Sequence, residues 1–242
     1  MAPNIWRLAR GYDRPATTAE QQDVTRCEQR RAELLRRTEP IGDVHETASG
    51  RHDVTTVGAE TQIASCPPDK ALFIYRMVRT MRPRLVVEFG SALGVSGSYI
   101  ASALRANGSG RLITVEGSPS RQAIAAESIE SVAPGVTTSI CGFFEDHLDV
   151  LDGADLFFND GNHNADAVQR YADAALERMA RPSVLLLDDA LGYSEEMVAA
   201  WERLRADRRF TASTLAKDVG VLSIGGSRAR SFVDHVVAKV AG

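Results

Sequence analysis

From residue 84 onward, short continuous apolar runs alternate with segments in which apolar residues recur at every third or fourth position. The short runs predict buried strands, and the three-and-four spacing predicts helices with one apolar face. This alternation is typical of a parallel sheet covered by helices on both faces. The predicted strands are 84–89, 111–116, 136–141, 155–160 and 183–188, and the helices that follow four of them begin near 95, 119, 165 and 195.

Two further apolar runs, 210–215 and 219–224, are separated by residues 216–218 alone. Because a parallel crossover needs a dozen or more residues, so short a connection predicts an antiparallel pair. The sequence therefore predicts the α/β class, with a Rossmann-like, doubly wound sheet of seven mostly parallel strands that ends in an antiparallel C-terminal hairpin. A closing helix is expected over 227–240.

Residues 1–69 do not follow this alternation. Thr17 and Glu20 have the spacing of a capping box, which predicts a helix over 21–37 with a thin apolar face, ended by Pro40. The polar stretch 41–69 is expected to be irregular, and a helix over 69–81 leads into the first strand. We expect residues 1–69 to form an N-terminal extension that serves as a lid or packs a homodimer, and residues 70–242 to form the main domain.

Composition limits the classes of function. The chain has 242 residues, of which 44% are hydrophobic and 25% charged, as in an ordinary soluble globular protein. A net charge of -4 gives no support for binding nucleic acid or an anionic membrane, so a small-molecule partner is expected. No apolar stretch resembles a membrane span or a secretory signal, and three widely spaced cysteines fit reduced thiols, so a cytoplasmic location is expected.

The loop after the first predicted strand contains Gly90, Gly94 and Gly97. Glycines between a strand and a helix let backbone N–H groups approach a ligand closely, which predicts a binding site for a cofactor. The spacing matches neither the G-x-G-x-x-G of dinucleotide folds nor the G-x-x-x-x-G-K-[ST] of P-loops. A nicotinamide-dependent dehydrogenase is therefore disfavoured.

The pattern E-x-G-x-x-x-G, formed by Glu88, Gly90 and Gly94, resembles motif I of the class I S-adenosylmethionine-dependent methyltransferases. The resemblance implies the strand order 3-2-1-4-5-7-6, with the loop around the methionine and ribose of the cofactor and Glu88 at its cationic end. It also implies that Glu116, at the end of the second strand, accepts the ribose hydroxyls. The residues expected to bind the cofactor are Glu88, Gly90, Ser91, Gly94, Ser96, Glu116, Gly142, Phe143 and Asp160.

Three later motifs make the resemblance more specific. The sequence DGNH, residues 160–163, follows the fourth strand, DD at 188–189 follows the fifth, and AWE at 200–202 lies on the next helix. This order resembles a bacterial small-molecule subgroup of class I methyltransferases that is related to catechol-type O-methyltransferases. It implies methyl transfer to an oxygen of a small molecule, in bacterial natural-product metabolism. The subgroup's D-D-x-H-W-S turn is replaced here by DDALGYSEE.

The acids of these motifs lie at the carboxyl ends of predicted parallel strands, where open α/β sheets bind ligands. In the catechol-type relatives, acids there hold a magnesium-like ion that orients two substrate oxygens. The candidate ligands are Asp160, Asp188 and Asp189, although Asp189 stands where an asparagine is usual; alternatively, these acids cap turns. His163 is the candidate general base, with Asp160 beside it, because histidine titrates near neutral pH; alternatively, it is structural.

Other outcomes remain open at this point. The same cofactor could donate its aminocarboxypropyl chain or cyclise, or the protein could bind it without turnover. Tyr99, Tyr193 and Trp201 could line a pocket or belong to the core.

Overall fold

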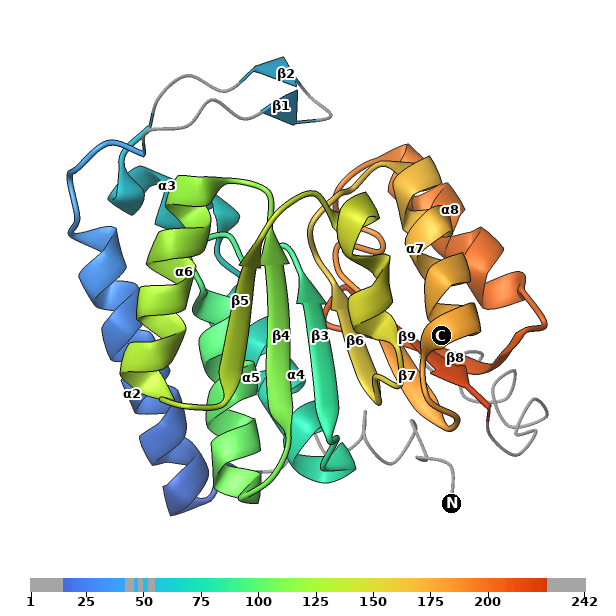
Figure 1. Cartoon of the computed structure of the whole chain (residues 1–242), viewed down its shortest axis with the longest axis horizontal. Coiled ribbons are helices and arrows are strands. Elements are labelled where there is room, and N and C mark those ends of the chain that lie inside the picture. The colour runs from blue at the N-terminus through green and yellow to red at the C-terminus, as the bar shows by residue number, and fades with distance from the viewer. Residues whose placement is uncertain (1–14, 42–45, 48–49, 52–54, 226–242) are drawn as a thin grey trace.

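The computed structural model describes residues 15–41, 46–47, 50–51 and 55–225, and its centre is one seven-stranded sheet (Figure 1). The sheet order is β5-β4-β3-β6-β7-β9-β8. Numbered along the chain, this is 3-2-1-4-5-7-6, so the predicted order is confirmed. The strands are β3 (Leu85–Phe89), β4 (Arg111–Glu116), β5 (Thr137–Cys141), β6 (Leu156–Asn159), β7 (Ser183–Leu187), β8 (Phe210–Ala216) and β9 (Val219–Ile224).

The strand directions also agree with the pattern of the sequence. β5, β4, β3, β6 and β7 run parallel to one another, and Phe89 at the end of β3 pairs with Asn159 at the end of β6. β9 pairs antiparallel with both β7 and β8. The β8–β9 turn is built on Lys217 and Asp218, which both have positive φ. The five parallel strands therefore direct the loops after β3, β4, β5, β6 and β7 to one edge of the sheet.

Helices cover both faces of the sheet, each over its own hydrophobic cluster (Figure 1). Val86 faces one cluster and Val87 the other, as alternate residues of a strand must. Tyr99 and Trp201 are buried in these clusters, so both belong to the core. One face carries α2 (Thr18–Leu35), α4 (Pro68–Met81), α5 (Val95–Asn107) and α6 (Pro119–Val132), and the other carries α7 (Ala165–Arg178), α8 (Glu195–Ala206) and the 3-10 segment η2 (Phe144–Leu151).

Helix α2 begins at the predicted capping box, in which the side chain of Thr17 accepts from the Glu20 amide and Glu20 accepts from the Thr17 amide. Asp23 accepts a hydrogen bond of 2.6 Å from the Tyr75 hydroxyl on α4, and Cys27 is buried in the main core. Helix α2 is therefore a layer of the fold rather than a loose appendage.

The expectation that 41–69 is irregular was wrong. The stretch contains the short pair β1 (Glu46–Thr47) and β2 (Gly50–Arg51), and helix α3 (Val57–Ala64), which is capped by the Thr56 side chain. Helix α3 is held by a backbone contact, because a Cβ on Gly58 would lie 2.6 Å from the Leu35 carbonyl oxygen. A helix of two turns is too short to show a periodic apolar face. The predicted helix over 227–240 lies outside the described residues.

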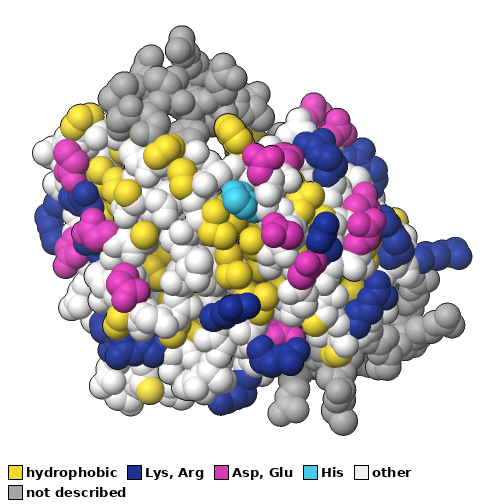
Figure 2. All heavy atoms as spheres, viewed as in Figure 1, with side chains coloured by type: hydrophobic (Ala, Val, Ile, Leu, Met, Phe, Trp, Pro, Cys, Tyr) yellow, Lys and Arg dark blue, Asp and Glu magenta, His cyan; other side chains and the backbone are white. Residues whose placement is uncertain are grey.

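Within the described residues, no helix is both long and apolar enough to cross a membrane. On the face of the molecule that Figures 1 and 2 both present, apolar side chains reach the surface near the middle, with charged side chains around them (Figure 2).

Candidate active site

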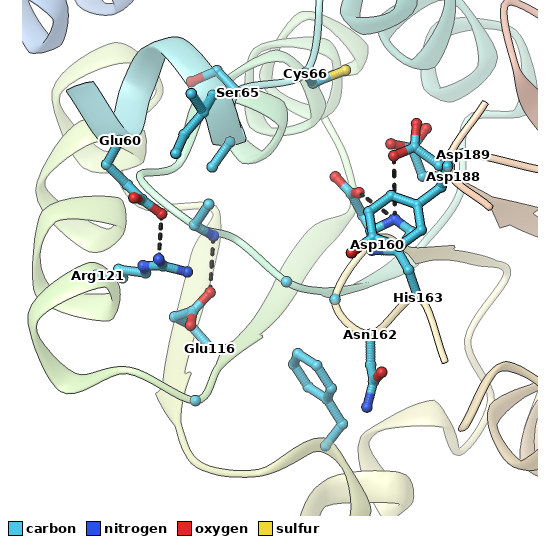
Figure 3. A pocket seen from close by; sticks show the side chains of 18 of the residues that line it. Glu60, Ser65, Cys66, Glu116, Arg121, Asp160, Asn162, His163, Asp188 and Asp189 are labelled. Carbon is cyan, nitrogen blue, oxygen red and sulfur yellow. Dashed lines mark hydrogen bonds and ion pairs between the residues drawn. The ribbon is translucent and has the colours of Figure 1, made fainter. Parts of the chain in front are cut away.

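A cavity of about 680 Å³ lies at the edge where the parallel strands end (Figure 3). The loops after β3, β4, β5, β6 and β7 all contribute to its lining. Helix α3 and the segment up to Lys70 add a further wall, which comes from the N-terminal part of the chain. The cavity therefore occupies the place where open α/β sheets bind ligands.

At one end of the cavity the chain presents backbone. Gly90 has φ 88°, and a Cβ there would lie 2.4 Å from the Cα of Gly161 and 2.6 Å from the Asp160 carbonyl oxygen. The loops after β3 and β6 therefore touch through the main chain, which requires glycine at position 90. Gly94 has φ 84° as the N-cap of α5, and a Cβ there would lie 2.7 Å from the Ala125 carbonyl oxygen. Both glycines of the motif are thus required by conformation and by packing.

Glu116 ends β4 and faces the cavity beside this loop. Its carboxylate accepts hydrogen bonds from the Ala92 amide at 2.9 Å and the Ser118 amide at 3.0 Å. Burial raises the pKa of this carboxyl above its ordinary value. Close by, Arg121 of α6 forms an ion pair with Glu60 of α3, which ties the N-terminal wall of the cavity to α6.

The other predicted cofactor residues divide into two groups. Gly142 and Phe143 line the cavity, and Phe143 is 71% exposed rather than part of the core. Ser91, Gly94 and Ser96 are not part of the lining; Ser91 and Ser96 are buried.

Glu88 lies beneath the loop, fully buried, and points toward α5 and β4. It accepts a hydrogen bond of 2.7 Å from the Thr114 hydroxyl, and burial raises its pKa to about 7. Because its side chain does not line the cavity, the geometry does not favour the direct cofactor contact predicted for Glu88. Its position in β3 explains this, since the preceding Val87 and the following Phe89 face the opposite side of the sheet.

At the other end of the cavity, charged side chains converge from distant parts of the chain. The Lys70 Nζ of α4 lies 2.8 Å from Asp188 Oδ1 and 2.8 Å from Asp189 Oδ1. Burial opposes the charge on Lys70, but Asp188 and Asp189 outweigh it and raise the pKa of the amine above its ordinary value. Burial and the adjacent Asp188 raise the pKa of Asp160 well above its ordinary value, which favours a protonated Asp160 that donates a hydrogen bond to Asp188.

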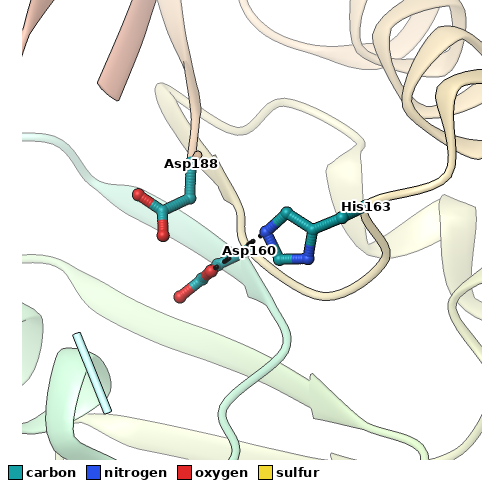
Figure 4. Close-up of side chains that lie close together, drawn as sticks. All are labelled: Asp160, His163 and Asp188. Atoms are coloured by element: carbon teal, nitrogen blue, oxygen red, sulfur yellow. Dashed lines mark ion pairs between the residues drawn. The ribbon is translucent and has the colours of Figure 1, made fainter. Parts of the chain in front are cut away.

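His163 lies beside Asp160 and Asp188 (Figure 4), and like them it lines the cavity. Its Nε2 lies 3.5 Å from Asp189 Oδ2 and 3.9 Å from Asp160 Oδ1, and its ring stacks on Tyr193 at 4.5 Å between centroids. Burial lowers the pKa of His163, so the imidazole is neutral at neutral pH. Of the three aromatic residues considered from the sequence, Tyr193 is the one that lines the cavity.

Three of these groups have donor types that suit a divalent ion. Asp160, His163 and Asp188 each offer one ligand atom, and the three atoms lie within 4.8 Å of one another. Two of the three predicted ligands, Asp188 and Asp189, are however already paired with Lys70. An ion held by Asp188 and Asp189 would compete with the ammonium for the same oxygens.

Lys70 was missed by the sequence reasoning, although one signal pointed to it. Of the 28 basic residues, lysine occurs only at 70, 217 and 239, and the others are arginine. A lysine in a chain that otherwise uses arginine indicates a position that suits a compact ammonium better than the planar guanidinium of arginine.

Residues 87–190 match the family model of a methyltransferase domain. Over these residues the chain is similar to a methyltransferase domain. The match begins within β3 and ends after Asp189, so it includes the glycine loop, Glu116 and the DGNH motif. Lys70 lies outside the matched residues. No curated protein matches the chain in sequence.

Solved structures show the same fold over most of the chain. An O-methyltransferase from Bacillus cereus in complex with SAH is 17% identical, with 88% of this chain and 92% of that chain covered and a TM-score of 0.57. The O-methyltransferase TomG from Streptomyces achromogenes, involved in tomaymycin synthesis and solved with SAM, is also 17% identical, covers 88% and 92%, and has a TM-score of 0.55. The SAH-bound methyltransferase PaMTH1 from Podospora anserina is 14% identical, covers 92% and 94%, and has a TM-score of 0.63. The predicted class I methyltransferase fold is thus confirmed for this domain.

Proposed function

We propose that the methyltransferase domain transfers a methyl group from S-adenosylmethionine to an oxygen atom of a small-molecule acceptor. The observation that supports this most directly is that one cavity has two chemically different ends. Backbone and Glu116 form one end, and His163 with its neighbouring acids forms the other. One end suits a nucleoside with a diol, and the other suits an acceptor that must lose a proton.

The first end supplies what a nucleoside donor needs. The Glu116 carboxylate is fixed by two backbone N–H groups, which leaves its remaining lone pairs to accept from ribose hydroxyls. The exposed ring of Phe143 offers a surface for an adenine to stack on, beside Gly142. The loop from Gly90 to Ala92 brings main-chain groups to the methionine portion. Glu88, Ser91, Gly94 and Ser96 act on the donor through the loop that they hold in place.

The second end supplies a base. S-adenosylmethionine, when bound, supplies an activated methyl group on a sulfonium. The acceptor oxygen forms the new carbon–oxygen bond as the carbon–sulfur bond breaks, the sulfur keeps the electron pair as a thioether, and the acceptor proton goes to His163. The Nε2 lies 3.5 Å from Asp189 Oδ2, and the charge of this carboxylate favours a proton on that nitrogen. We therefore assign the role of base to Nδ1, because the nitrogen that does not face the carboxylate is the one free to take a proton.

The natural-product context stays part of this proposal. TomG, with the same fold, is involved in tomaymycin synthesis, and a hydroxylated intermediate of such chemistry would fit the second end of the cavity. The lid role proposed for the N-terminal extension is supported by α3, which forms one wall of the cavity. Arg121→Ala, which removes the ion pair that ties α3 to α6, should then lower turnover. Measurement of the oligomeric state of the full chain tests the alternative role in a homodimer.

The test is product analysis with methyl-labelled S-adenosylmethionine and a panel of phenols, catechols and sugars. The expected result is a labelled methyl ether together with S-adenosylhomocysteine. Methylthioadenosine as the co-product would instead indicate transfer of the aminocarboxypropyl chain, and loss of the cofactor without an acceptor would indicate cyclisation. Calorimetry that detects no binding of S-adenosylmethionine or S-adenosylhomocysteine would contradict the proposal altogether.

A further inference from the structure

Lys70 is the side chain at the second end of the cavity that neither the family match nor the proposed function explains. It lies in the first turn of α4 and is 7% exposed. Its amine contacts Asp188 and Asp189, the two residues that follow the C-terminal end of β7. Lys70 and Asp189 are 119 residues apart in the chain. Asp188 is itself 4% exposed, so this is a buried contact that fixes both partners, unlike a surface ion pair.

Asp189 is also held in an unusual backbone conformation. Its φ is 48°, in the left-handed region that asparagine and aspartate tolerate better than other side chains. The turn thereby aims the Asp189 Oδ1 at Lys70 and the Asp189 Oδ2 at His163 Nε2. One carboxylate thus connects the ammonium to the proposed base.

A divalent ion and Lys70 cannot use these oxygens together. A hard cation contacts carboxylate oxygens at about 2.0–2.6 Å. An ion bound to Asp188 Oδ1 would then lie no more than about 5.4 Å from an ammonium that is 2.8 Å from the same atom. Two cations so close in a buried site repel each other strongly. The negative charge of the carboxylates that an ion would need is already neutralised by the lysine.

Lys70 also has an N–H group available to donate a hydrogen bond. Of its three ammonium N–H groups, one donates to Asp189 and a second faces Asp188. The third has no partner in the part of the chain that is described, and Lys70 lines the cavity. A donor N–H on a cation, placed beside a neutral imidazole, suits an oxygen that is about to lose its proton.

We propose that the Lys70 ammonium serves as a built-in cation at the acceptor end of this cavity, in place of a divalent metal ion. It binds one acceptor oxygen through its third N–H, while His163 takes the proton of that oxygen. This inference rests on the proposed function. It also defines the substrate class, because an ion can chelate two neighbouring oxygens whereas a single N–H binds one. A lone phenolic or enolic hydroxyl is then sufficient, and a vicinal diol is not required.

The test measures metal binding on the full chain, independently of turnover, with Mn²⁺ alone as the probe. Wild-type protein is expected to bind no Mn²⁺ up to millimolar concentration by electron paramagnetic resonance. Lys70→Met frees Asp188 and Asp189 and should raise Mn²⁺ affinity at least tenfold, whereas Lys70→Arg, which keeps the charge, should not. Lys217→Met is the matched control, because it removes a lysine that pairs with Asp69, the residue before Lys70 in α4.

One equivalent of Mn²⁺ bound by the wild type and lost in Asp188→Asn would overturn the proposal. This measurement decides the question even if the Lys70→Met variant does not fold. Turnover gives a second readout: a monohydroxylated phenol should be methylated at the same rate with and without EDTA. Methyl transfer that EDTA abolishes would refute the built-in cation while leaving the proposed function intact. Absence of any methyl transfer, with Mn²⁺ binding as expected, would refute the function alone.

Discussion

The two ends of the cavity are built in different ways. The donor end is formed by backbone of the loops after β3 and β4, with one carboxylate, Glu116, held by main-chain N–H groups. The acceptor end is formed by charged side chains from α4 and from the loops after β6 and β7. The proposed donor end thus depends mainly on main-chain geometry, whereas the proposed acceptor end depends on side chains brought together from distant parts of the chain.

This difference predicts how the two ends respond to substitution. Changes at the acceptor end should alter turnover and leave donor binding and folding largely intact. Changes at the donor end should act on stability or on donor affinity, because the loop there is part of the packing of the sheet.

The largest expected effect is that of His163→Asn. The variant keeps a polar side chain but no base, so kcat/KM should fall by about 10²–10⁴-fold, the usual contribution of a positioned base. Affinity for S-adenosylhomocysteine, measured by calorimetry, should stay within twofold of the wild type. A variant that also loses donor affinity would show that the two ends are not separate.

The same residue predicts a pH profile. Burial lowers the pKa of His163, and the base works in its neutral form, so activity should fall as pH decreases through that lowered value. The midpoint of the acid limb of kcat/KM is therefore expected below about 6.5, the ordinary value for histidine. A midpoint above 6.5 would indicate that the neighbouring carboxylates outweigh burial.

At the donor end, Glu88→Gln should change the pH dependence of stability without changing donor affinity. The carboxyl has a pKa of about 7 in the folded protein against 4.5 as a model group, so between these values the folded state holds more protons than the unfolded state. The contribution of Glu88 to the unfolding free energy is therefore fully present below about pH 4.5 and falls as pH rises toward 7. The total loss is about 3 kcal/mol. Glutamine removes this loss.

The measurement is urea unfolding of wild type and Glu88→Gln at pH 5 and pH 8. The difference in unfolding free energy between the two proteins should move in favour of the variant as pH rises. Weakened donor binding by the variant at both pH values would support the direct contact between Glu88 and the cofactor that was predicted from the motif.

The glycine loop could be predicted from the sequence better than the cluster around Lys70, for a physical reason. Buried parallel strands are continuous apolar runs, and the glycine spacing follows from local φ values and close packing at Gly90 and Gly94, so both are visible in consecutive residues. The partnership of Lys70 with Asp188 and Asp189 joins residues that are distant in the chain, and no local pattern specifies it. Helix α3 was not predicted because its eight residues are too few to show a periodic pattern of apolar positions.

Gly90→Ala tests how far the donor end depends on backbone. The left-handed φ alone should cost about 1–2 kcal/mol, and the added Cβ meets main-chain atoms of Gly161 and Asp160 that cannot rotate away. Unfolding free energy and donor affinity should therefore fall together. Gly108→Ala is the control, because Gly108 also has positive φ but has nothing within 4 Å of its Cβ, so it should show the conformational cost without the loss of donor binding.

Phe143→Ala should give the smallest effect and the sharpest separation of binding from folding. The side chain is 71% exposed, so its removal should change the unfolding free energy by less than about 0.5 kcal/mol. Loss of an aromatic contact to adenine should weaken donor binding by about two- to tenfold, corresponding to roughly 0.5–1.5 kcal/mol. Ile63→Ala is the matched control, because Ile63 is 73% exposed and lines the same cavity from α3. If both variants weakened donor binding equally, the adenine would lie against α3 as well as against the loop after β5, and the N-terminal wall would belong to the donor end.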